Sequence, residues 1–219
     1  YPAAVAARHL TGHLLSCAIY QALGKVIPEQ VIADSGGAPA FRLGFAGVND
    51  AGERFGQILF ASGGMGASSR QDGLSTTAFP TNSGAGSIEA LEAVVPLLLT
   101  RKEYRQDSGG AGRFRGGLGQ ECGVQSLGSR PVMMGMLGDR ESHPAMGLHG
   151  GMPGAVAQVV LPDGSSASLK SQSTLLPGGR VVIRFAGGGG FGSPAQRGVS
   201  AVAADLADGF VSVEQVRNV

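Results

Sequence analysis

Glycine is the residue type that most constrains what this chain can fold into. The 219-residue sequence contains 38 glycines, more than twice the share of roughly 7% that is usual in proteins. These glycines do not recur at a fixed period, so neither a collagen-like nor a solenoid architecture fits. They gather between apolar segments of β-like sequence, which argues against a disordered chain. Because glycine has no Cβ, we expect the clusters to build tight loops in which backbones approach closely.

Hydrophobic periodicity predicts a helical start, a β-rich body and a helical tail. Apolar residues at helical spacing predict helices over 3–23 and 200–207. Ser87 should cap a further short helix that Pro96 ends. Strand-like segments lie at 41–48, 53–61, 97–105, 121–127, 132–137, 156–161, 167–169 and 180–185. Glycine-rich loops are expected over 62–86, 107–119 and 187–192. The predicted fold class is α+β, in one portion covering 1–219 with a possible subdivision into 1–100 and 101–219.

Charge, hydropathy and cysteine usage narrow the possible partners. The formal net charge is +1, so we expect no nucleic-acid partner. No apolar run approaches the roughly 20 residues of a transmembrane helix, so we expect no membrane partner. Cys17 and Cys122 lie far apart without CxxC spacing, which is typical of buried free thiols in a reducing cytoplasm. The chain begins Tyr1-Pro2 without a signal-peptide pattern, as if cut from something longer.

The glycine motifs do not predict a nucleotide-binding loop in this chain. Gly187-x-Gly189-x-x-Gly192 follows a strand, as a dinucleotide-binding fingerprint would. Ser193-Pro194 interrupts the helix that should hold the pyrophosphate, and the remaining residues are too few for a paired βαβ half. A structural turn is the favoured interpretation. No GxxxxGK[ST] loop exists either, so any ATP must bind to another fold or another chain.

Histidines offer two candidate metal sites. His9 and His13 are four residues apart, a spacing that can place two imidazoles on one metal. Leu10 occupies the glutamate position of HExxH, so two helix-surface histidines are the favoured interpretation. A second set lies in nearby loops and comprises Asp139, Glu141, His143 and His149. A metal or acid–base role for this set competes with an incidental polar loop, so no metal ligand is assigned.

The loop over 107–119 carries most of the candidate site residues. Arg113 and Arg115 are separated by one residue, so in an extended segment their side chains would point the same way. Beside glycine N–H groups, the two guanidiniums could hold a carboxylate or a phosphate. Alternatively, they bridge local carboxylates such as Asp107, and both interpretations stay open. The candidate catalytic residues are Asp72, Asp107, Arg113 and Arg115, and we expect the loop at a catalytic cleft or a partner interface.

Several longer blocks, in order along the chain, resemble the hydantoinase B/oxoprolinase family. They are 63–67 with 70–73, Asn82 with 89–92 and Pro96, the stretch DSGGAGRFRGGLG at 107–119, Asp139-Arg140, GLHGGMPG at 147–154, 177–179 and 187–194. Ser193 stands where the family tends to have an acidic residue, and Ser87-Ile88 stand where it usually has a proline. The resemblance spans nearly the whole chain and corresponds to the C-terminal part of a subunit more than twice as long.

This resemblance implies a two-part, ATP-dependent enzyme. The family includes N-methylhydantoinases, 5-oxoprolinases, caprolactamase-like enzymes, and acetone or acetophenone carboxylases. It implies a hydantoinase A-like partner subunit that binds ATP and Mg and phosphorylates the carbonyl oxygen of a small-molecule substrate. The B-type subunit then directs water or a carbon centre onto the activated intermediate, and a divalent metal is expected in its missing N-terminal part.

The resemblance leaves three hypotheses about activity. The preferred one is a subunit of an ATP-dependent cyclic amidase of hydantoinase or 5-oxoprolinase type. A subunit of an acetone- or acetophenone-type carboxylase is the alternative from the same family. A non-catalytic module that only packs against the ATPase partner is the alternative from another class.

Overall fold

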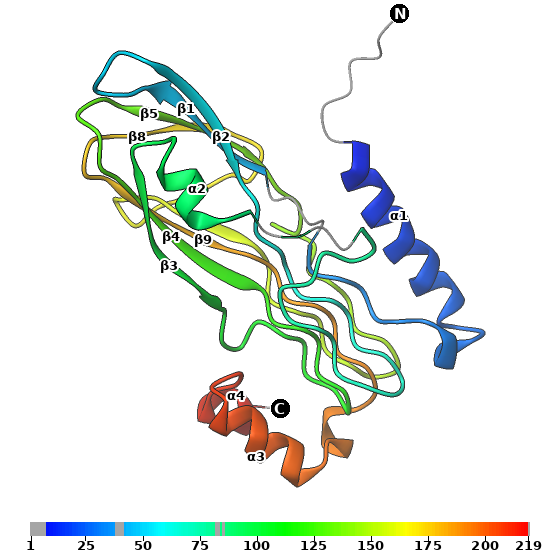
Figure 1. Cartoon of the computed structure of the whole chain (residues 1–219). Helices are drawn as coiled ribbons and strands as arrows, with labels where there is room; N and C mark the ends of the chain where they lie inside the picture. The colour runs from blue at the N-terminus through cyan, green and yellow to red at the C-terminus, as the bar shows by residue number, and fades with distance from the viewer. Residues whose placement is uncertain (1–7, 38–41, 82–83, 85, 219) are drawn as a thin grey trace, which may run out of the picture.

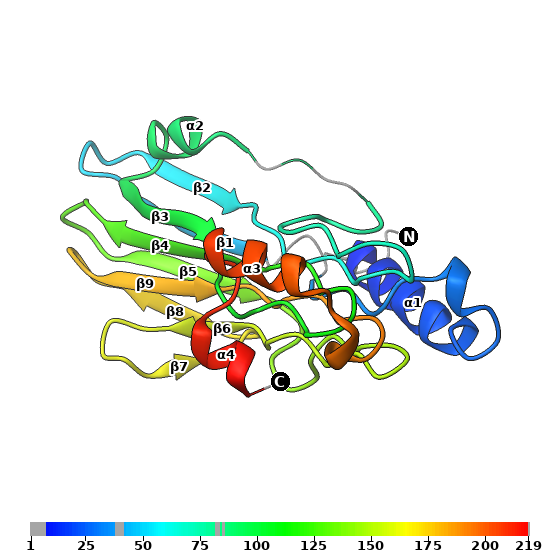
Figure 2. The ribbon, with the colours of Figure 1, turned by 90° about the horizontal axis from the view of Figure 1, so that it is seen from below.

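The chain folds into a β-sandwich that continues into a bundle of glycine-rich segments. The computed structural model describes residues 8–37, 42–81, 84 and 86–218. Figure 1 shows the two sheets packed face to face at one end and the glycine-rich segments running out from them at the other. Figure 2 shows α1 (Arg8–Leu23) beside these segments, with α3 (Val199–Ala207) and α4 (Val213–Arg217) placed apart from it. The predicted α+β class is confirmed.

The remaining elements agree largely with the sequence pattern. The strands are β1 (Arg42–Val48), β2 (Arg54–Leu59), β3 (Leu97–Tyr104), β4 (Gln120–Ser126), β5 (Val132–Leu137), β6 (Gln158–Val160), β7 (Ser166–Ala167), β8 (Gln172–Leu175) and β9 (Arg180–Arg184). Short helical elements are α2 (Ile88–Glu92) and the two 3-10 turns Pro28–Gln30 and Pro194–Gln196. Residues 3–7 of the predicted first helix lie outside the described residues. Among the helices that the structure describes, none is long and apolar enough to cross a membrane.

One strand and one α-helix were not predicted, and neither were the two 3-10 turns. Strand β8 reads Gln-Ser-Thr-Leu and has a single apolar residue, Leu175, which enters the core. Helix α4 does have a local signal, because Ser212 and Gln215 stand at capping-box spacing. In the structure the Ser212 hydroxyl accepts a hydrogen bond from Gln215 N–H at 3.1 Å.

The two sheets are antiparallel and share one core. One sheet has the strand order β2-β1-β5-β8 and the other has the order β3-β4-β9-β6-β7. Because β1 pairs with β5, the first sheet combines strands from both sides of residue 100. Alternate residues of each strand point inward, as expected for a half-buried sheet. The best-buried core side chains, each at most 1% exposed, include Leu43, Phe45, Val124, Met134 and Ile183.

The glycine bundle consists of five segments, 33–37, 63–67, 108–119, 145–155 and 187–192, with the last at its centre. The N–H groups of residues 187–190 donate, in order, to the carbonyls of Ala155, Gly117, Asp34 and Met152. The first and fourth N–H groups therefore reach the same neighbouring segment. An N–H direction that repeats after three residues is typical of an extended backbone that makes one turn every three residues. The predicted turn at 187–192 is instead the central extended segment, because four neighbouring segments supply its hydrogen-bond partners.

Glycine is required in the bundle by close packing. A Cβ built on Gly64, Gly116 or Gly188 would lie within 3.0 Å of a backbone carbonyl of a neighbouring segment. Real Cβ atoms essentially never approach that closely, so the segments could not pack at this spacing with any side chain there. The glycine clusters thus do bring backbones close together, as expected, but in a long-range bundle more than in local loops.

Candidate functional site

Three of the four predicted site residues hold the C-terminal tail, defined here as residues 194–217. Asp72 pairs with Arg197, and Arg115 pairs with Asp205. The Asp107 carboxylate accepts a hydrogen bond from the N–H of Ser212, at the start of α4, at 2.7 Å. The site residues from the glycine-rich loops therefore meet a part of the chain that the sequence analysis had not connected with them.

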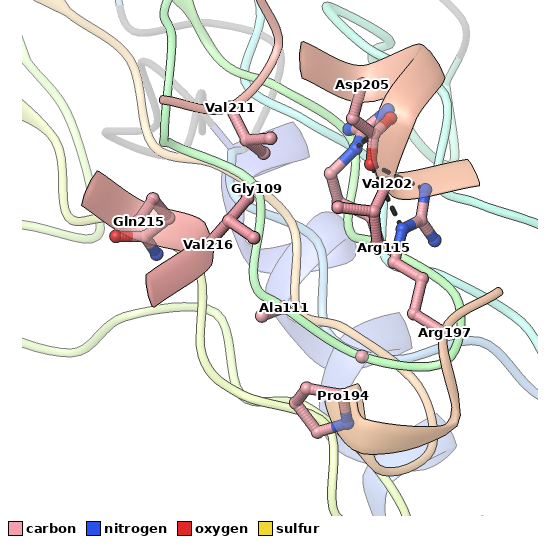
Figure 3. A pocket seen from close by; sticks show the side chains of 11 residues that line it. Gly109, Ala111, Arg115, Pro194, Arg197, Val202, Asp205, Val211, Gln215 and Val216 are labelled. Atoms are coloured by element: carbon pink, nitrogen blue, oxygen red, sulfur yellow. Dashed lines mark hydrogen bonds and ion pairs between the residues drawn. The ribbon is translucent and has the colours of Figure 1, made fainter. Parts of the chain in front are cut away.

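Asp72, Arg115, Arg197 and Asp205 form one ion-pair cluster, part of which is drawn in Figure 3. Arg197 binds Asp72 with two parallel bonds, both 2.8 Å long. Its Nη2 also lies 2.7 Å from an oxygen of Asp205. The other oxygen of Asp205 lies 3.2 Å from Nε of Arg115. Side-chain exposure is 7% for Arg115, 8% for Asp205 and 10% for Arg197, so most of the cluster is removed from water.

Two further contacts fix Arg115. Its Nη1 donates to the Gly116 carbonyl at 2.8 Å, and its guanidinium lies 5.0 Å from the ring centre of Phe210. A cation over an aromatic face is attracted to it, and more strongly where water is excluded. Arg115 therefore fastens the tail through a carboxylate and an aromatic ring together.

Of the two interpretations left open, the bridge between Asp107 and an arginine does not form among the described residues. Asp107 has a left-handed φ of 59° and directs its backbone N–H to the carbonyl of Phe210, so its partners are in the tail. The expectation that Arg113 and Arg115 point the same way is wrong, because Arg113 is exposed and Arg115 is buried. That expectation assumed a flat strand. In the three-residue repeat of the glycine bundle, side chains two residues apart face different sides.

The electrostatics of the cluster disfavour acid–base catalysis by Asp72. Partial burial by itself raises the pKa of Asp72, but the hydrogen bonds and charge of Arg197, with the Arg115 N–H, outweigh it. The net pKa of Asp72 is below its ordinary value, and the bonds to Asp72 raise the pKa of Arg197. The carboxylate stays ionised and the guanidinium stays protonated near neutral pH. The cluster is suited to holding a fixed geometry.

Asp72 should make attachment of the tail sensitive to acid. A carboxyl with a lowered folded-state pKa contributes stability that is present above its unfolded value, 3.8 here, and lost as the pH falls below it. We therefore expect Asp72→Asn to be less stable than wild type at neutral pH, and this difference to shrink as the pH falls below about 3.8. Urea unfolding at a series of pH values measures it. A difference that stays constant with pH would contradict this role.

Arg113 lies beside the cluster in an open depression. The residues that line this depression are Gln71, Asp72, Arg113, Phe114, Gln196, Arg197, Gly198 and Ala201. The Arg113 guanidinium lies 5.3 Å from the ring centre of Phe114, and within the described part of the chain no carboxylate pairs with it. On the other side of the cluster, a mainly apolar pocket lies between the glycine-rich loop and the two C-terminal helices (Figure 3). Arg113 is thus the predicted site residue with a guanidinium available to a ligand.

Among the side chains that the structure describes, no candidate metal site assembles. His13 is buried, not on the helix surface, and its Nδ1 lies 2.7 Å from the carbonyl of Phe79. The side chain of His9 lies outside the described residues. Asp139 pairs with Lys170, and His149 contacts the carbonyl of Gly24. Among the described residues, no group of three or more His, Cys, Asp or Glu side chains could hold a metal.

Neither cysteine can serve as a nucleophile near neutral pH. Both thiols are free and buried, as predicted. Burial, with the Asp34 carboxylate nearby, raises the pKa of Cys17 to about 11. Burial raises the pKa of Cys122 to about 12. A thiol that stays protonated is a poor nucleophile.

Sequence reasoning missed the tail's half of the cluster. Asp205 does have a signal, because it is the one charged residue in α3, Val-Ser-Ala-Val-Ala-Ala-Asp-Leu-Ala. A lone charge on an apolar helix is expected to find a partner where that helix is buried. Arg197 has no comparable signal, since it follows a proline-containing turn that is common at a helix start.

Comparison with known proteins gives the chain a family. The family model for hydantoinase B/oxoprolinase matches residues 1–194. The beta subunit of a caprolactamase from Pseudomonas jessenii is 32% identical over 93% of this chain and 37% of that subunit. The crystal structure of the ATP-dependent caprolactamase from P. jessenii matches with a TM-score of 0.77 and 27% identity, over 90% of this chain and 36% of that one. A nucleotide-free acetone carboxylase shares the fold, with a TM-score of 0.73 and 23% identity over 94% of this chain and 32% of that one.

The caprolactamase beta subunit that matches this chain is much longer than the chain itself. The chain spans 37% of the caprolactamase beta subunit, little more than a third of its length. Most of the C-terminal tail lies beyond the matched residues, although Asp72 and Arg115, which hold the tail, lie within them. Because the family model covers residues 1–194, the chain belongs to the hydantoinase B/oxoprolinase family.

Proposed function

We propose that these residues are the C-terminal portion of the B-type subunit of an ATP-dependent cyclic amidase. The observation that carries the proposal is the 32% identity to a caprolactamase beta subunit along 93% of the chain. The substrate class is a hydantoin, 5-oxoproline or a lactam. A hydantoinase A-like subunit is the partner, the missing N-terminal part of the same subunit completes the site, and the setting is cytoplasmic.

We assign ATP and Mg to the partner, because the segment of this chain that most resembles a nucleotide-binding loop does not fit a phosphate. The N–H groups that a phosphate would need at 187–190 are all bonded to backbone carbonyls. A metal, if the enzyme uses one, is assigned to the missing N-terminal part.

Within this proposal, the four candidate residues divide by exposure. Arg113, exposed beside Gln71 and Gln196, contacts an anionic group of the substrate or of the partner. Asp72, Asp107 and Arg115 are positioning residues, which fix the glycine-rich loop against the tail. On this proposal, the loop lies at the catalytic cleft or at the partner interface.

The test is an activity screen of the complete enzyme. The subunit is purified with its ATPase partner, and ATP hydrolysis is measured with hydantoins, 5-oxoproline, lactams, and ketones with bicarbonate. Hydrolysis coupled to ring opening of a cyclic amide supports the proposal. Turnover confined to ketones with bicarbonate supports the alternative of a carboxylase. Acetone carboxylase, which shares this fold, represents that alternative. Full activity of the complex after deletion of this portion would favour a non-catalytic assembly module.

Arg113→Ala should reduce turnover without reducing stability. A charge-assisted contact is worth roughly 1.5–3 kcal/mol, so its loss should cost about tenfold or more in activity. The melting temperature should not change, because the guanidinium is exposed. Arg180→Ala, at an exposed arginine on β9, is the matched control and should be neutral. Wild-type turnover and partner affinity in Arg113→Ala would leave the loop with no role beyond structure.

A further inference from the structure

The outward face of the sheet β2-β1-β5-β8 carries no charge at its centre. The residues at its centre are Gly44, Ala46, Gly56, Ile58, Met133 and Gly135. Strand register places them in two rows, since Gly44 lies opposite Ile58 and Gly135, while Ala46 lies opposite Gly56 and Met133. Opposite residues in antiparallel strands share a face. An antiparallel sheet with one face in water normally alternates apolar and polar residues, and the centres of β1, β2 and β5 do not. Polar residues on this face lie around the centre, at Arg54 of β2 and at Gln172 and Thr174 of β8.

The other sheet of the same molecule provides an internal comparison. Its outward face carries Glu121 between Arg101 and Arg184, with a distance of 2.8 Å from Glu121 to Nε of Arg184. Arg180 donates to Gln125 on the same face. One outer face of the sandwich thus carries charged groups at its centre, as a face in water does, and the other lacks them.

The shape of the uncharged face also suits a docking surface. Nothing lies within 4 Å of a Cβ built on Gly135, and the nearest atom to one on Gly44 is a backbone oxygen at 3.9 Å. These two glycines lie opposite each other, so they leave open space on the sheet between the side chains around them. Ile58, 39% exposed, stands on the β2 side of the pair, and Gln172 stands on the β8 side. Met133, 50% exposed, is the next residue of β5 on this face. Such a surface can accept large apolar side chains from a segment laid across the sheet.

We propose that this outer sheet face is the seat of the remaining part of the same subunit, which lays an uncharged segment with large apolar side chains over Gly44 and Gly135. The caprolactamase relatives carry nearly two thirds of their length outside the matched stretch, since 37% of the beta subunit is covered. This inference rests on the proposal that the chain is a portion of such a subunit. The charged outward face of one sheet is then covered by water, and the uncharged outward face of the other is covered by protein.

The lack of charge favours this occupant over a separable partner. Interfaces between proteins that exist independently are about as polar as the rest of their surfaces, whereas permanent contacts resemble a domain core. The outward side of α1 supports the same occupant, because Leu15, Ile19 and Leu23 are 58%, 46% and 39% exposed along one stripe. Between Thr11 and Leu23 this helix contains no Asp, Glu, Lys or Arg.

Methionine oxidation tests the proposal directly. Hydroxyl-radical footprinting is done on the 219-residue chain, on the complete subunit, and on the complete subunit with its ATPase partner. Met133 should oxidise readily in the 219-residue chain and should fall to the level of buried Met134 in the complete subunit alone. Met152, which is 48% exposed and lies elsewhere, is the matched control for Met133.

Three results would overturn the inference. Met133 could remain reactive in the complete subunit, it could become protected only when the ATPase partner is added, or it could be protected in the 219-residue chain together with a dimer by light scattering. A second measurement does not depend on oxidation: Met133→Lys should leave the melting temperature of the 219-residue chain unchanged and should lower that of the complete subunit. Val199→Lys, at an 86% exposed residue, should be neutral in both. Since these readouts report burial, they stand even if the amidase assignment fails.

Discussion

A chain carrying Gly188→Ala is expected to be strongly destabilised. The added methyl group would meet the Met65 carbonyl from a neighbouring segment at less than 3.0 Å. Backbone cannot rotate away as a flexible side chain can, so the bundle must open. Overpacking a core with side chains costs roughly 1–3 kcal/mol, and a backbone clash should cost about 3 kcal/mol or more. For a chain of this size, the melting temperature should fall by roughly 6–12 °C.

Gly56→Ala is the matched control for this experiment. Gly56 is exposed on β2, and a Cβ built on it has nothing within 4 Å. The same substitution should therefore be neutral or slightly stabilising, since alanine loses less backbone freedom on folding than glycine. Thermal melts followed by circular dichroism compare the two variants. Equal melting temperatures for Gly188→Ala and Gly56→Ala would show that the segments are not packed as closely as described.

Local features of the fold could be predicted because their causes are local. The turn after β1 forms as expected, with Gly52 at a φ of 86° and its N–H bonded to the Asn49 carbonyl. The Ser87 hydroxyl caps α2 by accepting a hydrogen bond from Ala90 N–H at 3.2 Å. Such contacts join residues that are three to four positions apart, so the sequence displays both partners together.

The glycine bundle could not be predicted in the same way. Glycine is required at position 188 by the close approach of Met65 and Gly117, residues that are far from it in the sequence. Rules based on neighbouring residues predict a turn from a glycine cluster, because they take account of the backbone freedom of glycine and not of the close approach of another segment. Resemblance to a family located the glycine blocks in order, and the structure adds the reason that several of them must be glycine.

The ion-pair cluster shows the same limit for the candidate site. Arg115 and Asp205 are 90 positions apart, whereas Asp107 was considered as a partner because it is near in the sequence. The residue type was informative for Arg115, since this buried arginine does bind a carboxylate. Which carboxylate it binds follows from the path of the tail, and that path depends on the packing of α3.

Asp205→Ala is expected to have the second large effect. Its carboxylate lies between Arg115 and Arg197. Removing one partner of a buried ion pair costs about 3–5 kcal/mol, because a charge is left buried without its counter-charge. Asp72 still balances Arg197, so the stranded charge is that of Arg115. We expect the melting temperature to fall by roughly 6–20 °C and trypsin to cleave within 194–217 before the sandwich unfolds.

Asp208→Ala is the control for this change. Asp208 is exposed at the end of the same helix, where a negative charge is slightly unfavourable, so its removal should not lower stability. If Asp205→Ala and Asp208→Ala have the same melting temperature, the cluster does not hold the tail.

The two arginine variants distinguish a structural role from a contact role. If the cluster does hold the tail, Arg115→Ala should lower both the melting temperature and the turnover, because it releases α3. Arg113→Ala should lower turnover alone, since its guanidinium has no ion-pair partner among the described residues. A positioning role for Arg115 and a contact role for Arg113 require both of these results.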